Sequence, residues 1–500
     1  MTNLKLTSLT AHRSAAFLRF LAAFAIATAS VPAAQPQVKL QQLSTDTFSN
    51  SSSQHATEVG PDSFAFGSTI VTAFQVGRNF ASGSTDIGFS TSTDGGNTWT
   101  SGYLPGITQY YQGGQYQAAT DPSVVFDAMH KVWIIASLGV GLLSNDVLVS
   151  LSTDGLNWGN PVVVDNTSLF ADKPWVGCDN NDKQYYFHYG HCYVSWDDAG
   201  QADQMKMSTS TDGGDHWSTP YTLPTGFGLG GQPVVAAKGT ATVPFLGSGM
   251  QYFYSTDGGK TWRKVGKISS VTTHQVKGGL RVTGALPSVA VDGGNKVYVV
   301  WQDCRFRTNC SSNDIVMSTS SDGMKWSAVT RIPIDATNST VDHFIPGIAV
   351  DPSTSGKSAH LALTYYYYPV ANCTAKTCNL SVGYVSSQDG GQTWSSAQKL
   401  TSGMKVTWLP GTLLGYMVGD YISTSYVNGK AYGVFAVAAK PGSKYNEATF
   451  APASGLLEEA NAPVFSSAGE QPVPDAKSDH GPLAYWDSDG RLPKRRVTRK

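Results

Sequence analysis

Carboxylates, arginines and aromatic rings recur in this chain at positions expected just beyond strands, where side chains can meet a ligand. Two carboxyl groups can do acid and base work on a glycosidic bond, and arginine can bind a carboxylate through two hydrogen bonds. Aromatic rings can cover the faces of sugars. These residue types therefore indicate recognition or cleavage of an acidic sugar. The candidate catalytic residues are Glu58, Asp62, Asp86 and Asp303, and the candidate substrate-binding residues are Arg78, Arg281, Arg305, Trp175, Trp301, His343 and Tyr421.

Each candidate also has an ordinary structural explanation. An aspartate after a strand is commonly a turn former, and Trp196 or Trp301 can serve only to pack one unit of the fold against the next. The convergence of many such residues therefore carries more weight than any one of them.

A repeated turn in the sequence indicates the elements that position these residues. The stretch Ser255-Thr256-Asp257-Gly258-Gly259-Lys260-Thr261-Trp262 occurs in six versions, two of them one residue shorter. Repetition at such a period indicates stacked supersecondary units. In each copy the Asp carboxylate can accept backbone N–H groups, glycine supplies a positive φ, and the Trp can pack between neighbouring units. The aspartates of the six copies are Asp94, Asp154, Asp212, Asp257, Asp322 and Asp389.

The residues between the turns predict four strands per unit, which is the pattern of a propeller blade. Alternation in Asp314–Ser318 and the apolar run Lys296–Trp301 are examples of such strands. We expect an all-β propeller over residues 35–440, with seven blades favoured and six as the alternative. A strand near Val38, with a further strand at Leu483–Asp487, would close the last blade. Residues 441–500 are expected to be irregular, with that final strand and a basic tail.

The repeated turn matches the S-x-D-x-G-x-x-W pattern of the Asp-box, or BNR, repeat. Over roughly residues 55 to 440 the chain resembles the sialidase-like β-propeller superfamily, which implies a secreted exo-sialidase-like glycoside hydrolase. Such enzymes use three arginines, an Asp acid and a Tyr nucleophile activated by Glu. Arg78 with Asp86 matches the place of the first arginine and the acid, and Arg281 and Arg305 are the candidates for the second and third arginines.

Two features depart from that family's pattern. The family's arginine motif precedes its first repeat, whereas Arg331-Ile332-Pro333 follows the fifth copy here. There is also no glutamate between Glu58 and Glu447, so the Tyr–Glu pair cannot stand in its usual place. A tyrosine with an ordinary pKa near 10 is a poor nucleophile without a nearby base.

In a propeller the repeated Asp turns lie on one face, and a ligand site is expected on the other. We therefore interpret the six turn aspartates as structural. The opposite face is expected to collect the candidates given above together with a further group: His55, Asp121, Asp172, Lys173, Trp196, Asp197, Asp198, His274, Lys277, Asp342 and Asp420.

Three functions remain open on this basis. A carboxylate pair at a separation of roughly 5 to 9.5 Å would favour a glycoside hydrolase. A shallow site without such a pair would favour a non-catalytic glycan-binding or cell-surface propeller. His343 or His55 beside an arginine and a tyrosine would favour a lyase acting on uronic-acid polysaccharides.

Composition and the two ends of the chain set the compartment and the partners. Arg13, Arg19 and the apolar run Phe20–Ala27 predict a secretory signal peptide over residues 1–34. The six cysteines form three close pairs, which predicts the disulfides Cys178–Cys192, Cys304–Cys310 and Cys373–Cys378. Zinc binding by these cysteines is the alternative interpretation, but the pairs lack the spacing of zinc ligands.

The formal charge of −1 argues against nucleic acid as a partner. The partner expected is a carbohydrate or glycoconjugate, bound by a secreted monomer without a membrane span. No cofactor and no metal are predicted, and structural calcium is possible without being indicated.

Overall fold

The computed structural model describes residues 38–181, 188–458 and 470–473. The predicted signal peptide, the possible strand at 483–487 and the basic tail lie outside these residues. The described chain is almost entirely β-structure, as expected, and its helices are single 3₁₀ turns. These turns are η1 (Ala199–Gln201), η2 (Ala237–Gly239), η3 (Thr308–Cys310), η4 (Gly356–Ser358) and η5 (Val406–Trp408).

The strands pair in antiparallel runs of four, and each run is named here by its first strand. The first two runs are β2 (Ser53–Phe66), β3 (Thr69–Asn79), β4 (Ser84–Ser92), β5 (Thr100–Tyr103), then β6 (Ala118–Asp127), β7 (Val132–Val140), β8 (Asn145–Ser152), β9 (Val162–Asp165). The next two are β10 (Ala171–Cys178), β11 (Cys192–Asp198), β12 (Gln204–Ser210), β13 (Tyr221–Phe227), then β14 (Val234–Ala236), β15 (Thr240–Gly247), β16 (Gly249–Ser255), β17 (Arg263–Ser269).

Two further runs follow before the last one. They are β18 (Ser288–Val291), β19 (Val297–Asp303), β20 (Asp314–Ser320), β21 (Thr330–Arg331), then β22 (Asp342–Val350), β23 (Leu361–Tyr368), β24 (Asn379–Ser387), β25 (Gln398–Lys399). Short accessory strands come next: β26 (Met404–Lys405), β27 (Gly411–Thr412) and β28 (Gly415–Tyr416). The predicted strands at Asp314–Ser318 and Lys296–Trp301 are thus confirmed as β20 and most of β19.

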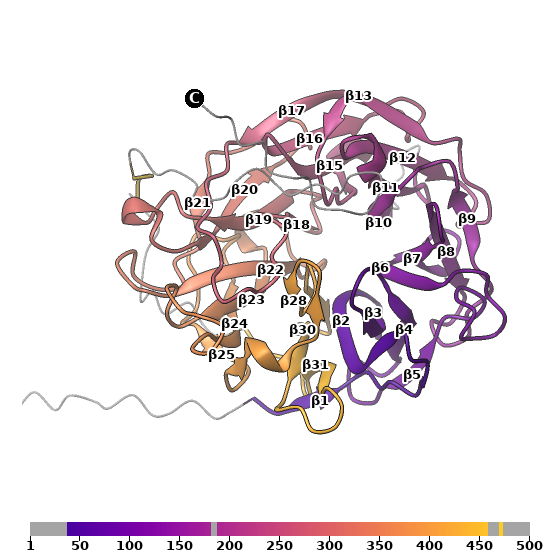
Figure 1. The fold of residues 1–500 in the computed structure, drawn as a ribbon. Coiled ribbons are helices and arrows are strands. Elements are labelled where there is room, and N and C mark those ends of the chain that lie inside the picture. The colour runs from indigo at the N-terminus through magenta and orange to yellow at the C-terminus, as the bar shows by residue number, and fades with distance from the viewer. Residues whose placement is uncertain (1–37, 182–187, 459–469, 474–500) are drawn as a thin grey trace, which may run out of the picture. The chain divides into compact units, whose positions relative to one another are not determined.

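The last run joins the two ends of the described chain. It contains β29 (Ser423–Val427), β30 (Lys430–Ala438), β31 (Glu447–Pro452) and β1 (Leu40–Gln42). Strand β1 pairs antiparallel with β31, and in Figure 1 the indigo start of the chain lies beside the yellow end. The strand expected near Val38 therefore does complete a sheet made from the C-terminal strands.

Residues 447–452 correct the expectation that the chain is irregular beyond 440. Strand β31 pairs with β30, with β1 and, through the single pair Thr57 and Glu447, with β2. Its short alternating stretch from Glu447 to Pro452 is surrounded by Ala, Pro and Ser, whose composition suggested a loop. Burial between two neighbouring strands stabilises it despite weak local propensity.

The six repeated turns have one hydrogen-bonding pattern. In the copy around Asp257, the Ser255 hydroxyl donates to the carboxylate at 2.8 Å and accepts the Gly259 N–H at 2.9 Å. The Thr261 N–H donates to the same carboxylate at 2.9 Å. Gly258 and Gly259 have φ values of 72° and 83°, which favour glycine. The aspartates therefore close turns, as the sequence predicts.

The tryptophan that ends each turn packs against the preceding run. Trp158 lies 5.8 Å from Phe89, Trp262 lies 5.7 Å from Tyr193, and Trp326 lies 5.7 Å from Tyr252, measured between ring centroids. Each partner belongs to the run before. The repeated motif thus shapes a hairpin and also supplies the apolar contact between neighbouring runs.

The three predicted disulfides are present. They join Cys178 to Cys192, Cys304 to Cys310, and Cys373 to Cys378, and no free cysteine remains. The first links β10 to β11 at a paired position. Among the described residues, no helix has the length and apolarity needed to cross a membrane.

Candidate functional site

The first strands of several runs contain a bulge at an X-Pro step, and this bulge positions the site. Asp121, Lys173 and Ile345 each precede a proline and have φ values of 51°, 46° and 48°. The strand register shifts at the same places in β6, β10 and β22. Non-glycine residues rarely adopt such a conformation, and strain of this kind concentrates at functional sites. The bulges therefore indicate Asp121 and Lys173 as candidate functional residues.

Five charged residues from four parts of the chain form what we call the charged cluster. It consists of Asp121 in β6, Asp172 and Lys173 in β10, Arg281 before β18, and Asp420 before β29. Arg281 binds Asp420 through two hydrogen bonds, at 3.0 Å from Nε and 2.5 Å from Nη2. The Lys173 ammonium lies 3.0 Å from Asp172 and 3.2 Å from Asp420.

Two carboxyl groups in this cluster have pKa values that move in opposite directions. Burial raises the pKa of Asp121 to about 6, although the Lys173 charge opposes the shift. Burial also raises the pKa of Asp172, but Lys173 and a hydrogen bond from Asp121 outweigh it, so that its pKa is lowered overall. Asp121 is therefore the proton donor of the pair and Asp172 the carboxylate. The side chain of Asp172 is 34% exposed, whereas Asp121 is buried.

A second layer supports Asp121 from the β2 run. The Thr120 hydroxyl lies 3.1 Å from both the Asp121 carboxyl and the Gln75 amide oxygen. Arg78 donates to that same amide oxygen at 3.3 Å and to the Gly83 carbonyl. Burial, followed by the nearby charge of Arg281, lowers the pKa of Arg78 to about 10. Arg78 is buried, so its charge acts on the cluster from the protein interior and not from the solvent side.

Two aromatic rings stand beside the charged cluster. The rings of Trp175 and Tyr421 meet edge to face, with centroids 4.9 Å apart. The Tyr421 hydroxyl donates to the Pro122 carbonyl at 2.9 Å. Burial and then Asp121 raise the pKa of Tyr421 well above its ordinary value. Tyr421 is thus neutral and anchored, while Trp175 is half-buried and available for contact.

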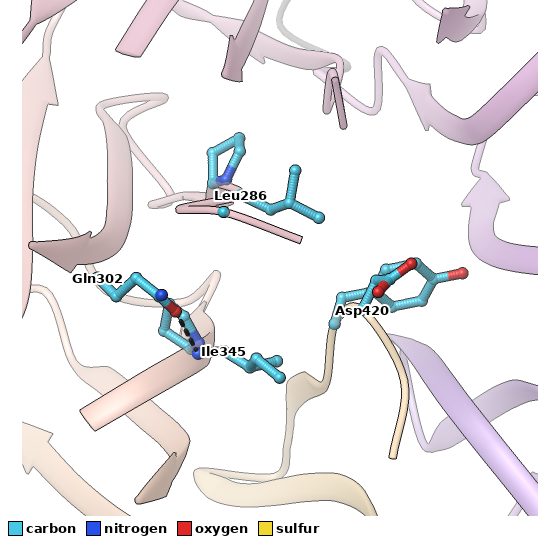
Figure 2. A pocket seen from close by; sticks show the side chains of 8 residues that line it. Leu286, Gln302, Ile345 and Asp420 are labelled. Atoms are coloured by element: carbon cyan, nitrogen blue, oxygen red, sulfur yellow. Dashed lines mark hydrogen bonds between the residues drawn. The ribbon is translucent and has the colours of Figure 1, made fainter. Parts of the chain in front are cut away.

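A small pocket lies next to Asp420 and Tyr421, where the segments before β18 and β29 meet β19 and the bulge of β22. Figure 2 shows Gln302 and Ile345 on one side of it and Asp420 on the other. The Gln302 side chain accepts the Ile345 N–H at 3.1 Å, so Gln302 holds the bulge of β22. Apart from Asp420 and Gln302, the wall is largely apolar or backbone.

Asp197 is a further carboxyl near the cluster. It pairs with Asp172 across β10 and β11, is fully buried, and neither of its oxygens has a hydrogen-bond partner among the described residues. Burial, together with the nearby charge of Asp172, raises its pKa well above the ordinary value. Burial thus disfavours the charged form of Asp197, which lies beside the more exposed Asp172.

The structure brings together four of the predicted substrate-binding and catalytic residues: Arg78, Arg281, Trp175 and Tyr421. Asp62 is close to Tyr421, but its carboxylate accepts the Val124 N–H at 2.8 Å and so connects β2 to β6. Ser123 and Ser288 connect later runs in the same way, through Val176 and Ile348 at 3.0 Å. This repetition indicates a structural position for Asp62.

Asp303, Arg305 and Trp301 form a separate group within the β18 run. Arg305 donates to Asp303 from Nε at 3.0 Å and from Nη2 at 2.6 Å. The indole of the fully buried Trp301 donates to the same carboxylate at 3.2 Å. These three residues contact one another, and among the described residues none of them bonds to the charged cluster.

The other predicted residues lie buried elsewhere. Asp86 in β4 is fully buried, accepts the Ile87 N–H, and has a pKa raised to about 8 by burial. His343 in β22 contacts Tyr365, with ring centroids 5.4 Å apart, and its side chain is only 2% exposed. Glu58 in β2 faces Glu447 of β31, at the place where the first and last runs meet.

The sequence places the residues of the charged cluster on the expected face, but it indicates a ligand role for Arg281 alone and none for Asp121, Asp172, Lys173 or Asp420. The signal for two of them is the X-Pro step in a first strand. For Asp420 the sequence carries no comparable signal, because its partner Arg281 lies 139 positions away.

Among the described residues, two groups of three His, Cys or Asp side chains lie close enough together to share a metal ion, and both are already engaged. One contains Asp127, Cys178 and Cys192, whose sulfurs form a disulfide. The other contains Asp314, Asp335 and His343, and there Arg307 and Arg331 bind the two aspartates. Neither set offers free ligands of the kind a structural metal requires.

Comparison with known proteins supports the prediction from the repeated turns. Residues 143–345 match the family model of the BNR repeat-like domain, which confirms the predicted resemblance to BNR-repeat proteins over that range. No curated protein sequence matches the chain.

Several solved structures are similar at low identity. A protein of unknown function from Dyadobacter fermentans is 15% identical, with a TM-score of 0.43 and coverage of 83% of this chain and 98% of that chain. A mutant of the NanB sialidase from Streptococcus pneumoniae is 16% identical, with a TM-score of 0.40 and coverage of 84% and 71%. A polysaccharide lyase described as an ulvan lyase is 10% identical, with a TM-score of 0.45 and coverage of 80% and 94%. At these identities, neither the activity nor the residues of those proteins transfer to this chain.

Proposed function

We propose that the chain is a seven-bladed β-propeller whose blades are the seven four-stranded runs. The first strands β2, β6, β10, β14, β18, β22 and β29 contact one another in that order, and β29 contacts β2. Such a closed circuit of inner strands is what a propeller requires. The pairing of β1 with β31 supplies the outer strand of the last blade from the other end of the chain.

We further propose that this propeller is a glycoside hydrolase with its active site at the charged cluster. The observation that carries this proposal is the pair Asp121 and Asp172, because their pKa values are pushed apart by their surroundings. Pairs of this kind define the acid and the base in many hydrolases. Asp121 would protonate the leaving oxygen, and Asp172 would act as the base or nucleophile toward the anomeric carbon.

The short distance between the two carboxyl groups means that they must separate when the substrate binds. In the free protein Asp121 donates a hydrogen bond to Asp172, so the two groups are closer than the separation of about 5 Å or more found in glycosidases. Catalysis therefore requires the substrate oxygen to displace the Asp172 carboxylate from Asp121. The 34% exposure of the Asp172 side chain is consistent with such a movement toward solvent.

The charges around the pair favour an acidic sugar as substrate. Arg281 uses Nε and Nη2 for Asp420, while among the described residues its Nη1 has only a long contact of 3.7 Å with the Met417 sulfur. Nη1 could therefore donate to a substrate carboxylate, and the half-buried Trp175 could cover one sugar face. The buried Arg78 adds to the positive charge of Arg281 from the interior side of the cluster. The disulfides are consistent with the exported location predicted from the N-terminus.

A panel of acidic glycans tests this function directly. The purified protein, Asp121→Asn and Asp172→Asn should be assayed for both binding and product release on sialosides and uronic-acid polymers. We expect product release by the unchanged protein and a loss of at least about 100-fold in either variant, with binding retained. Asp94→Asn is the matched control, because it changes a turn carboxylate outside the cluster. Full activity in Asp121→Asn would contradict the assignment.

A non-catalytic glycan-binding propeller is the second candidate, and one observation favours it. Most charges in the cluster already neutralise each other, as in Arg281 with Asp420 and Lys173 with Asp172. Binding without product release would support this alternative. The lyase alternative has less support, because His343 is buried and both ring nitrogens of His55 contact Asp46 and Asn50.

A further inference from the structure

The contact between the first and last runs contains two buried glutamates. Glu58 lies in β2 and Glu447 in β31, and these strands meet at the pair Thr57 and Glu447. Glu58 is 2% exposed and Glu447 is 1% exposed. Among the described residues, no other glutamate lies in a strand. We call this place the seam.

The polar atoms of the seam have fewer partners than buried groups normally have. Both carboxylate oxygens of Glu447, Oε1 of Glu58 and the hydroxyl of Thr449 have no hydrogen-bond partner among the described residues. Glu447 and Thr449 are two residues apart on one strand, so their side chains share a face. Buried polar atoms are nearly always satisfied in folded proteins, so four orphans in one place need an explanation.

Ser44 ties these groups together. Its hydroxyl donates to Glu58 Oε2 at 2.9 Å and accepts the Thr449 N–H at 2.8 Å. The Glu58 carboxylate therefore lies close to β31 at Thr449. The seam thus gathers two carboxylates and two hydroxyls from β2, from β31 and from the segment that follows β1.

No positive side chain balances the seam. Burial raises the pKa of Glu58 to about 8, with Ser44 opposing and Asp46 adding to the shift. Burial and then Glu58 raise the pKa of Glu447 well above its usual value. No lysine, arginine or histidine among the described residues contributes to either shift. Asp46 itself is held by His55 and by the Ala56 N–H.

A proton shared between Glu58 and Glu447 does not explain the positions of these oxygens. If the two carboxyl groups shared a proton, an oxygen of Glu447 would lie within hydrogen-bond distance of Glu58, and no such bond exists among the described residues. A cation held at about 2.4 Å from each oxygen keeps its ligands farther apart than hydrogen-bonded atoms. Oxygen-only ligands favour a hard cation over zinc.

We propose that Glu58 and Glu447, with the hydroxyls of Thr449 and Ser44, bind a calcium ion that joins the first run to the last. Two bidentate carboxylates and two hydroxyls supply about six oxygens, which is within the range that calcium uses. The ion would neutralise the two carboxylates and stabilise the contact at which β31 pairs with β2. The proposal does not depend on the function proposed for the charged cluster.

Metal analysis and thermal unfolding of the full chain test the site. The protein should be treated with a chelator, passed through a desalting column and titrated with calcium chloride while its melting temperature and calcium content are measured. We expect about one calcium per chain and a melting temperature that rises with calcium concentration. Glu447→Gln should weaken calcium binding at least about tenfold and remove most of the shift. Glu458→Gln is the matched control, since that glutamate pairs with His360 instead.

Thr449→Val provides a second variant in case Glu447→Gln does not fold. It removes one hydroxyl ligand without changing the charge, so we expect weaker calcium binding in a folded protein. The proposal is overturned if the unchanged protein binds no calcium and its melting temperature does not change with calcium concentration. It is also overturned if Glu447→Gln responds to calcium like the unchanged protein.

Discussion

At the scale of single residues, Asp420 is the group on which the charged cluster depends. It is nearly fully buried and accepts bonds from Arg281, Thr283 and Lys173. Burial raises its pKa, but Arg281 and Lys173 outweigh this, so the pKa is far below its usual range. A depressed carboxyl pKa stabilises the fold fully above the unfolded value near 4, and this stabilisation declines progressively as pH falls from that value through the folded pKa.

Removing this carboxylate should therefore be costly at neutral pH. We expect Asp420→Ala to lower the free energy of unfolding by about 3–5 kcal/mol, because it leaves two buried cations without a partner. Denaturant unfolding at pH 7 and at pH 3 measures the effect, which should shrink at the lower pH. Asp215→Ala, which removes an exposed carboxylate outside the cluster, serves as the control. An equal loss at both pH values would contradict the electrostatic explanation.

The sequence could predict part of this site and not the rest. Arg78, Arg281, Trp175 and Tyr421 were chosen because their types suit sugar binding, and the fold does bring them together. Arg305 was chosen for the same reason, yet Asp303, two residues earlier, binds it locally. Residue type alone cannot distinguish an arginine aimed at a ligand from one neutralised by its neighbour. That distinction depends on side-chain direction in the folded chain.

At the scale of elements, the repeated turn is a structural device. Asp257 accepts hydrogen bonds from Ser255 and from the backbone and hydroxyl of Thr261. We expect Asp257→Ala to lower the free energy of unfolding by about 1–2 kcal/mol, as for loss of a helix cap. Glycan binding and turnover per folded molecule should not change. Unaltered stability with lost turnover would show that the turn takes part in function.

The disulfides offer a second test at this scale. Cys178 and Cys192 are 14 residues apart, whereas the other two pairs are separated by 6 and 5 residues. The chain-entropy model gives about 3 kcal/mol for the longer loop and about 2 kcal/mol for the shorter ones. Thermal unfolding of double Cys→Ala variants should therefore show the largest loss for Cys178 and Cys192. The reverse order would mean that strain or local packing dominates.

The elements were more predictable than the site because local signals specify them. The turn motif, the strand alternation and the cysteine spacing are each contained within a few residues. Strand β31 was missed because its stability comes from pairing with β30 and β1, and the bulges at Asp121 and Lys173 were missed because an X-Pro step has several possible conformations.

At the scale of the whole molecule, the first and last strands depend on each other. Strand β1 covers an edge of β31, and Leu43 and Ala451 share a small apolar cluster there. A chain that begins at Ser44 should lose this pairing and melt at a lower temperature than one that begins at Gln35. It should also aggregate more readily, because a strand edge becomes exposed. Equal melting temperatures would show that β1 contributes little to closure.

The measurement that tests the central claim most directly is the pH dependence of product release on an acidic glycan, compared between the unchanged protein and Asp121→Asn. Asp121 must carry its proton to act as an acid, and its pKa is raised to about 6. We predict that activity of the unchanged protein falls as pH rises through about 6, and that Asp121→Asn has almost no activity at any pH. Activity that is constant across this range, or that survives in Asp121→Asn, would contradict the assignment of Asp121 as the acid of a glycoside hydrolase.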